Sequence, residues 1–323
     1  MVDGGTDVLA VDISTLDQET ITRVVADVLR SSRSIDRIEP LDTWRTRNSG
    51  FWRFRAHPGN AGEGPFDVVF KVERRWTPES AEGTYDALRR LSDLQDLTPG
   101  PSANISFPEP LGWTREPPGV VMPNVEGVEL FDVLADKGHP LWSEPDRLPE
   151  VVKSCGEAFG WIHRLAVIEP ETDAVRQEAL QRLPSLMRWM LNRGAPVGKG
   201  SVIRSHNFSR NDFLVSTDAQ LSVVDPPILG APALLHDDVA WFTYQLLSRA
   251  APEQRLPLRS SFLAGYQSSS LGGTFDNAGL RAVGICEASR ALGTAKRLLV
   301  KGEFAEAFRS FRIALTTRGR ISS

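Results

Sequence analysis

The amino-acid sequence predicts an α+β protein with two unequal parts, a small antiparallel sheet followed by a larger, mainly helical region. Three observations support this class. Apolar residues alternate in short runs between positions 38 and 123, the spacing becomes helical beyond position 148, and a glycine-containing linker at 125–127 separates the two patterns. The expected divisions are an acidic segment at 1–19, a sheet-bearing lobe at 20–125 and a helical lobe at 126–323.

The first lobe is expected to hold two helices and several strands. Apolar residues share one face of a helix over Thr20–Arg30. The stretch IEPLDTWRTRNSGFWRFRA alternates on both sides of a turn at residues 48–50, which is typical of a hairpin, and Phe51, Trp52 and Phe54 are interpreted as core residues of its second strand. A strand over Phe66–Val72, a helix over 79–94 and a short apolar strand before the linker complete the lobe.

The second lobe is expected to be built mainly from amphipathic helices. The predicted helices and strands, in chain order, are helices over Leu148–Leu165 and Glu178–Asn192, strands over Phe213–Ser216 and Leu221–Val224, and helices over Asp238–Ser248 and from Leu280 to the end. The segment Gln267–Asn277 has the composition of a surface loop.

Composition excludes several classes of protein. The formal net charge of −4 argues against general nucleic-acid binding, and no stretch is apolar enough for a membrane span, so we expect a cytoplasmic protein. The two cysteines, Cys155 and Cys286, lie in apolar helical contexts and are expected to be buried thiols. Basic residues gather beyond Arg281; we favour a solvated helical face there over a site for an acidic or phosphorylated partner.

Three chemically suggestive features follow one another along the chain. They are a strand lysine, Lys71, a polar loop over Ser205–Asp212, and an aspartate at the end of an apolar run, Asp225. This order, with a hairpin before the lysine and a helix after it, is the layout by which a kinase fold holds a nucleoside triphosphate. Phosphates need a cation, and Mg²⁺ needs carboxylate or amide oxygens.

In the stretches SHNFSRNDFLV, LSVVDPP and HDDVAWF the chain resembles the aminoglycoside phosphotransferase family, the choline-kinase-like branch of the kinase superfamily. The likeness runs from about Thr43 to Gln245 and implies a bilobal protein-kinase-like fold. By this resemblance, Lys71 would hold the phosphates of ATP, Asp225 would bind Mg²⁺ and Asp238 would brace the catalytic loop. The other expected nucleotide contacts are Asn48 and Ser49 in the hairpin turn, and Met122 and Asn124 in MPNVEGVEL, which resembles the hinge whose backbone meets adenine.

The catalytic loop departs from the family pattern. Without gaps, Ser205 stands at the family histidine, His206 at the glycine, Asn207 at the catalytic aspartate and Asp212 at the metal-binding asparagine. A gapped alignment instead makes His206 the family histidine and Asn211 the family asparagine. Both alignments place Asn207 at the base position, where an amide cannot accept a proton. A positioned base is worth a factor of about 10² to 10⁴ in rate.

The helix after Lys71 should supply an acid that orients the lysine. Glu79 and Glu82 lie three residues apart on one helical face, and Asp86 continues it. We favour Glu82.

Two main hypotheses for the function remain. The favoured one is a degenerate, pseudokinase-like module that binds a nucleotide together with a peptide, small molecule or partner protein, within a biosynthetic complex. The alternative is an active ATP- and Mg²⁺-dependent phosphotransferase that acts on a hydroxyl of a small molecule or of a peptide Ser or Thr; a changed nucleotide reaction is a minor third possibility. The segments expected to form the acceptor pocket carry no acidic cluster, which argues against a polycationic antibiotic as substrate.

Overall fold

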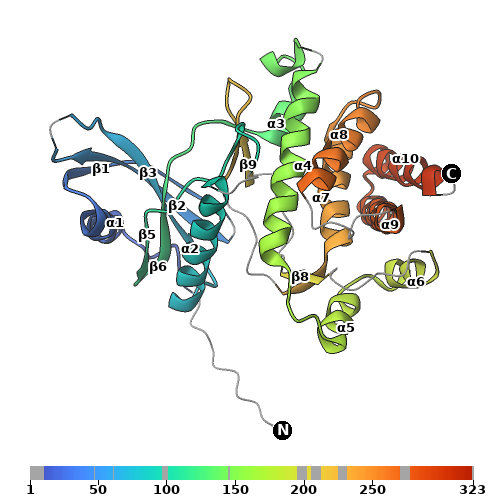
Figure 1. Cartoon of the computed structure of the whole chain (residues 1–323), viewed down its shortest axis with the longest axis horizontal. Coiled ribbons are helices and arrows are strands. Elements are labelled where there is room, and N and C mark those ends of the chain that lie inside the picture. Colours follow the sequence, from blue (N-terminus) through green and yellow to red (C-terminus); the bar gives the residue numbers. More distant parts are fainter. Residues whose placement is uncertain are drawn as a thin grey trace, which may run out of the picture. The chain divides into compact units, whose positions relative to one another are not determined.

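The chain forms two compact units, each with its own secondary structure (Figure 1). A computed structural model describes residues 11–46, 48–60, 62–96, 101–144, 146–194, 202–204, 212–224, 231–269 and 277–321. The first unit comprises Met1–Leu94 with Phe107–Glu126, and the second comprises Gln95–Ser106 with Gly127–Ser323.

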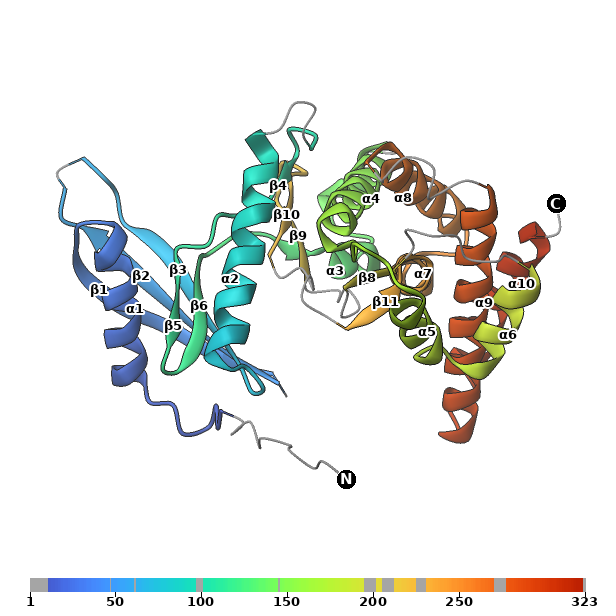
Figure 2. The same cartoon turned by 60° about the horizontal axis from the view of Figure 1, so that its bottom comes forward.

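A five-stranded antiparallel sheet forms the centre of the first unit. Its strands, in the order in which they are hydrogen bonded, are β1 (Ile35–Arg45), β2 (Ser49–Pro58), β3 (Phe66–Glu73), β6 (Pro118–Pro123) and β5 (Gly112–Arg115). Two helices, α1 (Gln18–Ser32) and α2 (Pro78–Ser92), lie on opposite faces of this sheet (Figure 2).

Successive side chains of each strand point to opposite faces of the sheet, so one set packs against α1 and the other against α2. Phe54 of β2 and Phe70 of β3 are fully buried in one cluster with Val25 and Leu29 of α1. Asp17 begins α1 as its N-cap, accepting a hydrogen bond from the amide of Thr20 at 2.8 Å, which satisfies one of the otherwise unpaired donors of the first turn.

The opposite face packs beneath α2. Val120 of β6 is buried there with Trp76, Ala81 and Leu88. Thr77 caps α2 and Pro78 occupies its first turn, where the missing N–H of proline costs nothing.

The second unit is mainly helical. Its helices are α3 (Leu130–Ala135), α4 (Arg147–Ala166), α5 (Asp173–Gln181), α6 (Ser185–Gly194), α7 (Leu235–Arg249), α8 (Arg255–Ser269), α9 (Asn277–Val300) and α10 (Phe304–Ile321), with short 3₁₀ turns at Asp93–Asp96 and Pro140–Trp142. Two small sheets accompany them: β4 (Ile105–Ser106), β10 (Leu221–Val223), β9 (Phe213–Val215) and β7 (Val128–Glu129) form one, and β11 (Pro232–Leu234) with β8 (Val202–Arg204) forms the other.

Two glycines let α4 and α8 approach closely. A Cβ atom added at Gly156 would lie 1.9 Å from the carbonyl oxygen of Phe262, and one added at Gly265 would lie 1.9 Å from that of Lys153. Around this crossing, Phe159 packs its ring against Phe262 at a centroid distance of 5.5 Å. The close crossing therefore forms the centre of the second unit's core.

The expected α+β class is confirmed, with a five-stranded antiparallel sheet in the first unit and a mainly helical second unit. Both cysteines are buried free thiols, and burial raises the pKa of Cys155 and of Cys286. Within the described residues, no helix is both long and apolar enough to span a membrane.

Three helix predictions need correction. The helix expected over Glu178–Asn192 is two helices, because Pro184 restricts the residue before it and has no N–H to donate. The helix expected from Leu280 onward is also two, α9 and α10, with a tight turn between them at Gly302, whose φ of +78° suits glycine. The helix α8 includes Gln267–Ser269, which the composition placed in a loop.

Candidate functional site

Lys71 lies on the face of the sheet opposite α1. Its neighbours on β3, Phe70 and Val72, point into the α1 core, so alternation turns Lys71 the other way. Its side chain is only 3% exposed, and its Nζ lies 2.6 Å from Oε1 of Glu73 and 5.2 Å from the ring centroid of Trp76. Among the lysines and arginines that the structure describes, no other is buried.

Glu73, rather than Glu82, supplies the carboxylate that the structure pairs with Lys71. Glu82 is exposed on α2, because that helix buries Ala81 and Leu88 against the sheet and turns its acids to solvent. The sequence did contain the signal for Glu73: residues two apart on a strand share a face.

Register places a row of side chains across the sheet at the level of Lys71. Trp44 of β1 lies opposite Phe51 of β2, Phe51 opposite Lys71, and Lys71 opposite Val120 of β6. The rings of Trp44 and Phe51 stack at 5.2 Å with an interplanar angle of 5°. Of the three aromatic residues expected in the core, Trp52 and Phe54 are buried in the cluster with α1, whereas Phe51 is partly exposed and lies on the Lys71 face.

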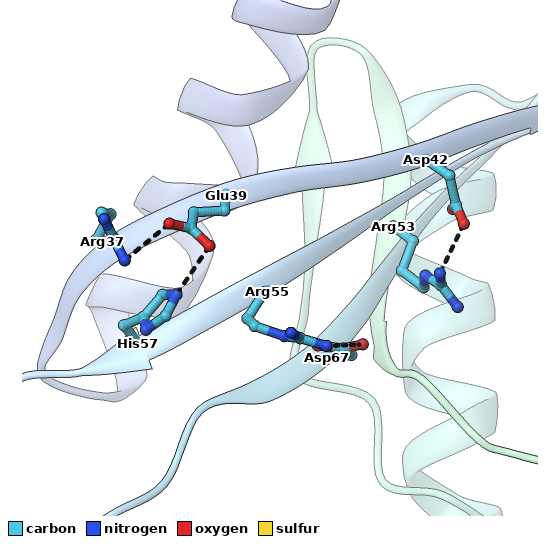
Figure 3. Close-up of polar contacts among 7 residues, drawn as sticks. All are labelled: Arg37, Glu39, Asp42, Arg53, Arg55, His57 and Asp67. Atoms are coloured by element: carbon cyan, nitrogen blue, oxygen red, sulfur yellow. Dashed lines mark hydrogen bonds and ion pairs between the residues drawn. The ribbon is translucent and has the colours of Figure 1, made fainter.

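Strand register places a series of polar pairs farther along the same face, and Figure 3 shows these pairs. The pairs are Arg37 with Glu39 at 2.7 Å, His57 with Glu39 at 3.2 Å, Arg53 with Asp42 at 2.7 Å, and Arg55 with Asp67 at 2.8 Å. The guanidinium of Arg55 lowers the pKa of Asp67 by hydrogen bonding to its carboxylate. The three arginines already have anionic partners and are partly exposed, which leaves Lys71 as the buried cation of the face in the described residues.

The backbone amides of the hairpin turn already donate hydrogen bonds within the turn. The N–H groups of Asn48 and Ser49 donate to Oγ1 of Thr46 at 3.3 and 3.0 Å, and the N–H of Arg74 donates to the carbonyl of Asn48 at 2.8 Å. A phosphate bound by these amides would have to displace Thr46. The predicted contact of Asn48 and Ser49 with a nucleotide thus stays a prediction. Such a contact would use their side chains.

Met122 and Asn124 end the strand that leads out of the sheet. Met122 lies opposite Val69 of β3, so these two apolar side chains share the face of Lys71. The N–H of Asn124 donates to the carbonyl of Asp67 at 2.9 Å and is already satisfied. An apolar surface next to a buried cation is suited to a planar base with attached phosphates.

Asp212 directly precedes β9 in the second unit and is buried, with 5% exposure. Its carbonyl accepts the N–H of Val224 at 3.0 Å, so Asp212 lies beside the residue that precedes Asp225. Asp225 itself, like His206 and Asn207, lies outside the described residues. Their predicted roles stay predictions.

Asp238 joins a buried polar chain across three helices. Its Oδ2 lies 3.1 Å from Nε2 of His163 on α4, and Nδ1 of that histidine lies 2.9 Å from the hydroxyl of Tyr266 on α8. Burial, with Asp238 nearby, raises the pKa of Tyr266. His163 and Tyr266 were not predicted as members of this site. They are 103 positions apart in the sequence, and local periodicity does not indicate contacts over such a separation.

Two further buried carboxylates tie α7 and α8 to α9. Asp237 receives Nε and Nη2 of Arg290 at 3.0 and 2.6 Å, yet burial raises the pKa of Asp237. Glu287, with no exposed surface, accepts Nε of Arg259 at 2.9 Å and the hydroxyl of Thr243 at 2.5 Å. The pairing with Arg290 explains why the carboxylate of Asp237 can be buried. Together these contacts fix the positions of the helices next to Asp238.

Comparisons with known proteins add little beyond this geometry. No protein-family model and no curated protein matches the chain. Among solved structures, the apo form of the pseudokinase GRMZM2G135359 matches at 13% identity with a TM-score of 0.37, over 91% of this chain and 95% of that chain. A TM-score this low carries no argument by itself. The order and topology of the elements establish the α+β class.

Proposed function

We propose that the protein is a nucleotide-binding, kinase-like module of the aminoglycoside phosphotransferase type that transfers phosphate poorly. The observation that carries this proposal is the burial of Lys71. Burying an ammonium group is costly unless it is paired, so a buried lysine on a sheet face indicates a site for anions. Glu73 holds that charge, and a triphosphate would compete with its carboxylate.

The described residues fit a nucleotide in part. Val69 and Met122 offer an apolar surface for the base, and Lys71 offers the cation for the phosphates. In the second unit, the family resemblance would make Asp212 and Asp225 the oxygen ligands of Mg²⁺. The turn amides at Asn48 and Ser49 fit less well because Thr46 already accepts their hydrogen bonds.

The sequence of the catalytic loop supports poor transfer. Asn207 occupies the base position and cannot take the proton of an attacking hydroxyl, which raises the barrier by roughly 3 to 5 kcal/mol. Phosphoryl transfer depends mostly on positioning and charge neutralisation, so slow turnover remains compatible with bound MgATP.

An active phosphotransferase is the second candidate, and the buried carboxylate of Asp212 is relevant to it through metal binding. A carboxylate where the family has an amide would strengthen metal binding while repelling the transferred phosphate. The acceptor would then be a hydroxyl of a small molecule or of a peptide Ser or Thr.

Purified protein with MgATP distinguishes the two candidates. The module predicts a rise in melting temperature without acceptor-dependent release of ADP, and the enzyme predicts ADP release that Asp225→Ala abolishes. No change in melting temperature and no ADP would contradict both.

A further inference from the structure

The helical hairpin α9–α10 exposes a stripe of aromatic side chains. Phe304, Phe308 and Phe311 are 68%, 64% and 42% exposed. Their spacing of four and then three residues puts them on one side of α10. We call these three residues the phenylalanine stripe.

The end of α9 extends this apolar surface. Leu299 and Val300 are 52% and 83% exposed, and only three residues separate them from Phe304. The turn is tight, since the N–H of Gly302 donates to the carbonyl of Leu299 at 3.1 Å. Five of the eleven large apolar residues that are exposed in the described part of the chain thus lie on one hairpin. Such a concentration is unusual for a surface with no binding role.

Basic residues lie on the same hairpin as the stripe. The exposed ones are Lys296, Arg297, Lys301, Arg309 and Arg312. Arg312 follows Phe308 by four residues and so lies beside it on the helix. Glu306 is two residues from both Phe304 and Phe308, about 200° around the axis, and therefore faces away from the stripe.

A third arginine strengthens the positive charge near Arg309 and Arg312. Arg255, at the start of α8, is partly buried. Burial and the positive charges of Arg309 and Arg312 lower the pKa of Arg255, whereas the negative charge of Glu253 raises it. Arg255 therefore lies near both Arg309 and Arg312, and guanidinium groups gathered in this way offer paired hydrogen-bond donors to carboxylates.

We propose that this face binds an acidic segment of a partner protein, with apolar side chains on the phenylalanine stripe and carboxylates on Arg309 and Arg312. This deepens the binding role proposed above by naming the partner, and it uses none of the nucleotide-site residues. Charge complementarity selects the occupant. A second copy of the chain would bring arginines against arginines, whereas an acidic segment neutralises them. The discrete arginine group favours a peptide over the diffuse charge of a lipid surface.

Selection from a library of short random peptides displayed on phage tests the proposal. The wild-type chain and the variant Phe308→Ser/Arg309→Glu/Arg312→Glu serve as parallel targets. The wild type is expected to enrich peptides rich in Asp and Glu together with apolar residues. The best of them, labelled with fluorescein, should lose at least about tenfold in affinity on the variant and weaken as salt rises.

Matched variants in the other unit provide the control. Leu41→Ser and Arg30→Glu remove an exposed apolar and an exposed basic residue from the first unit, and both should leave peptide affinity unchanged. Lys71→Met should keep peptide binding, and the triple variant should keep MgATP binding. Failure of the nucleotide-site proposal can therefore be distinguished from failure of the peptide-site proposal.

Several outcomes would overturn the inference. They are a selection that enriches nothing, enriched peptides without acidic residues, and equal affinity for wild type and triple variant. Binding of wild type, but not of the variant, to phosphatidylcholine vesicles containing phosphatidylserine would assign the face to a membrane instead. A dimer in sedimentation that the variant converts to monomer would assign it to self-association.

Discussion

Substitution of Gly156 by alanine is expected to destabilise the second unit strongly. The new Cβ would lie 1.9 Å from the carbonyl oxygen of Phe262, whereas real Cβ atoms essentially never come closer than 3.0 Å. The obstructing atom is backbone, so no side chain can rotate away. The helices α4 and α8 would have to separate by about an ångström, which loosens the contacts between Phe159 and Phe262. Overpacking of this kind costs about 3 kcal/mol.

Gly293 on α9 gives a control with the same chemical change. A Cβ at Gly293 meets nothing within 4 Å, and the residue lies inside a helix, so alanine there should stabilise by about 0.5 to 1 kcal/mol. Urea unfolding followed by circular dichroism measures both variants. Equal or opposite effects at Gly156 and Gly293 would refute the close crossing of α4 and α8.

Three further predictions concern charge, hydrogen bonding and catalysis. Arg55 lowers the pKa of Asp67 below its ordinary value of 3.8, so the stabilising effect of Asp67 should be present above pH 3.8 and vanish as the pH falls through the folded-state pKa. The unfolding free energies of wild type and Asp67→Asn, compared across pH, check this. A difference between them that grows on acidification would contradict it. Tyr266→Phe removes the hydrogen bond to His163 and should cost about 1 kcal/mol of unfolding free energy, whereas an unchanged midpoint in urea would show that this bond contributes nothing. Asn207→Asp should give measurable hydrolysis of ATP where the wild type shows little, and a variant no faster than wild type would remove the lost base as the explanation.

Local periodicity was sufficient for the elements whose contacts are local. The helix α1, the hairpin of β1 and β2, and the strand carrying Lys71 follow directly from the spacing of apolar residues, and each lies near its expected bounds. The helix boundaries at Pro184 and Gly302 were missed, although both residues are ordinary signals for a helix end.

The candidate site was harder to predict because its contacts depend on tertiary structure. Glu73 was overlooked in favour of Glu82, since the sequence does not say that α2 turns its acids to solvent. The chain of Asp238, His163 and Tyr266 joins three helices and has no local signature.

Isothermal titration calorimetry with MgATP tests the central claim, that Lys71 marks a nucleotide site. Lys71→Met keeps the length of the side chain and removes its charge, and Lys137→Met is the matched control because Lys137 is 72% exposed. The account predicts that wild type and Lys137→Met bind MgATP and that Lys71→Met loses at least about tenfold in affinity. Wild-type protein that binds no MgATP, or binds it as tightly without the ammonium group of Lys71, would contradict it.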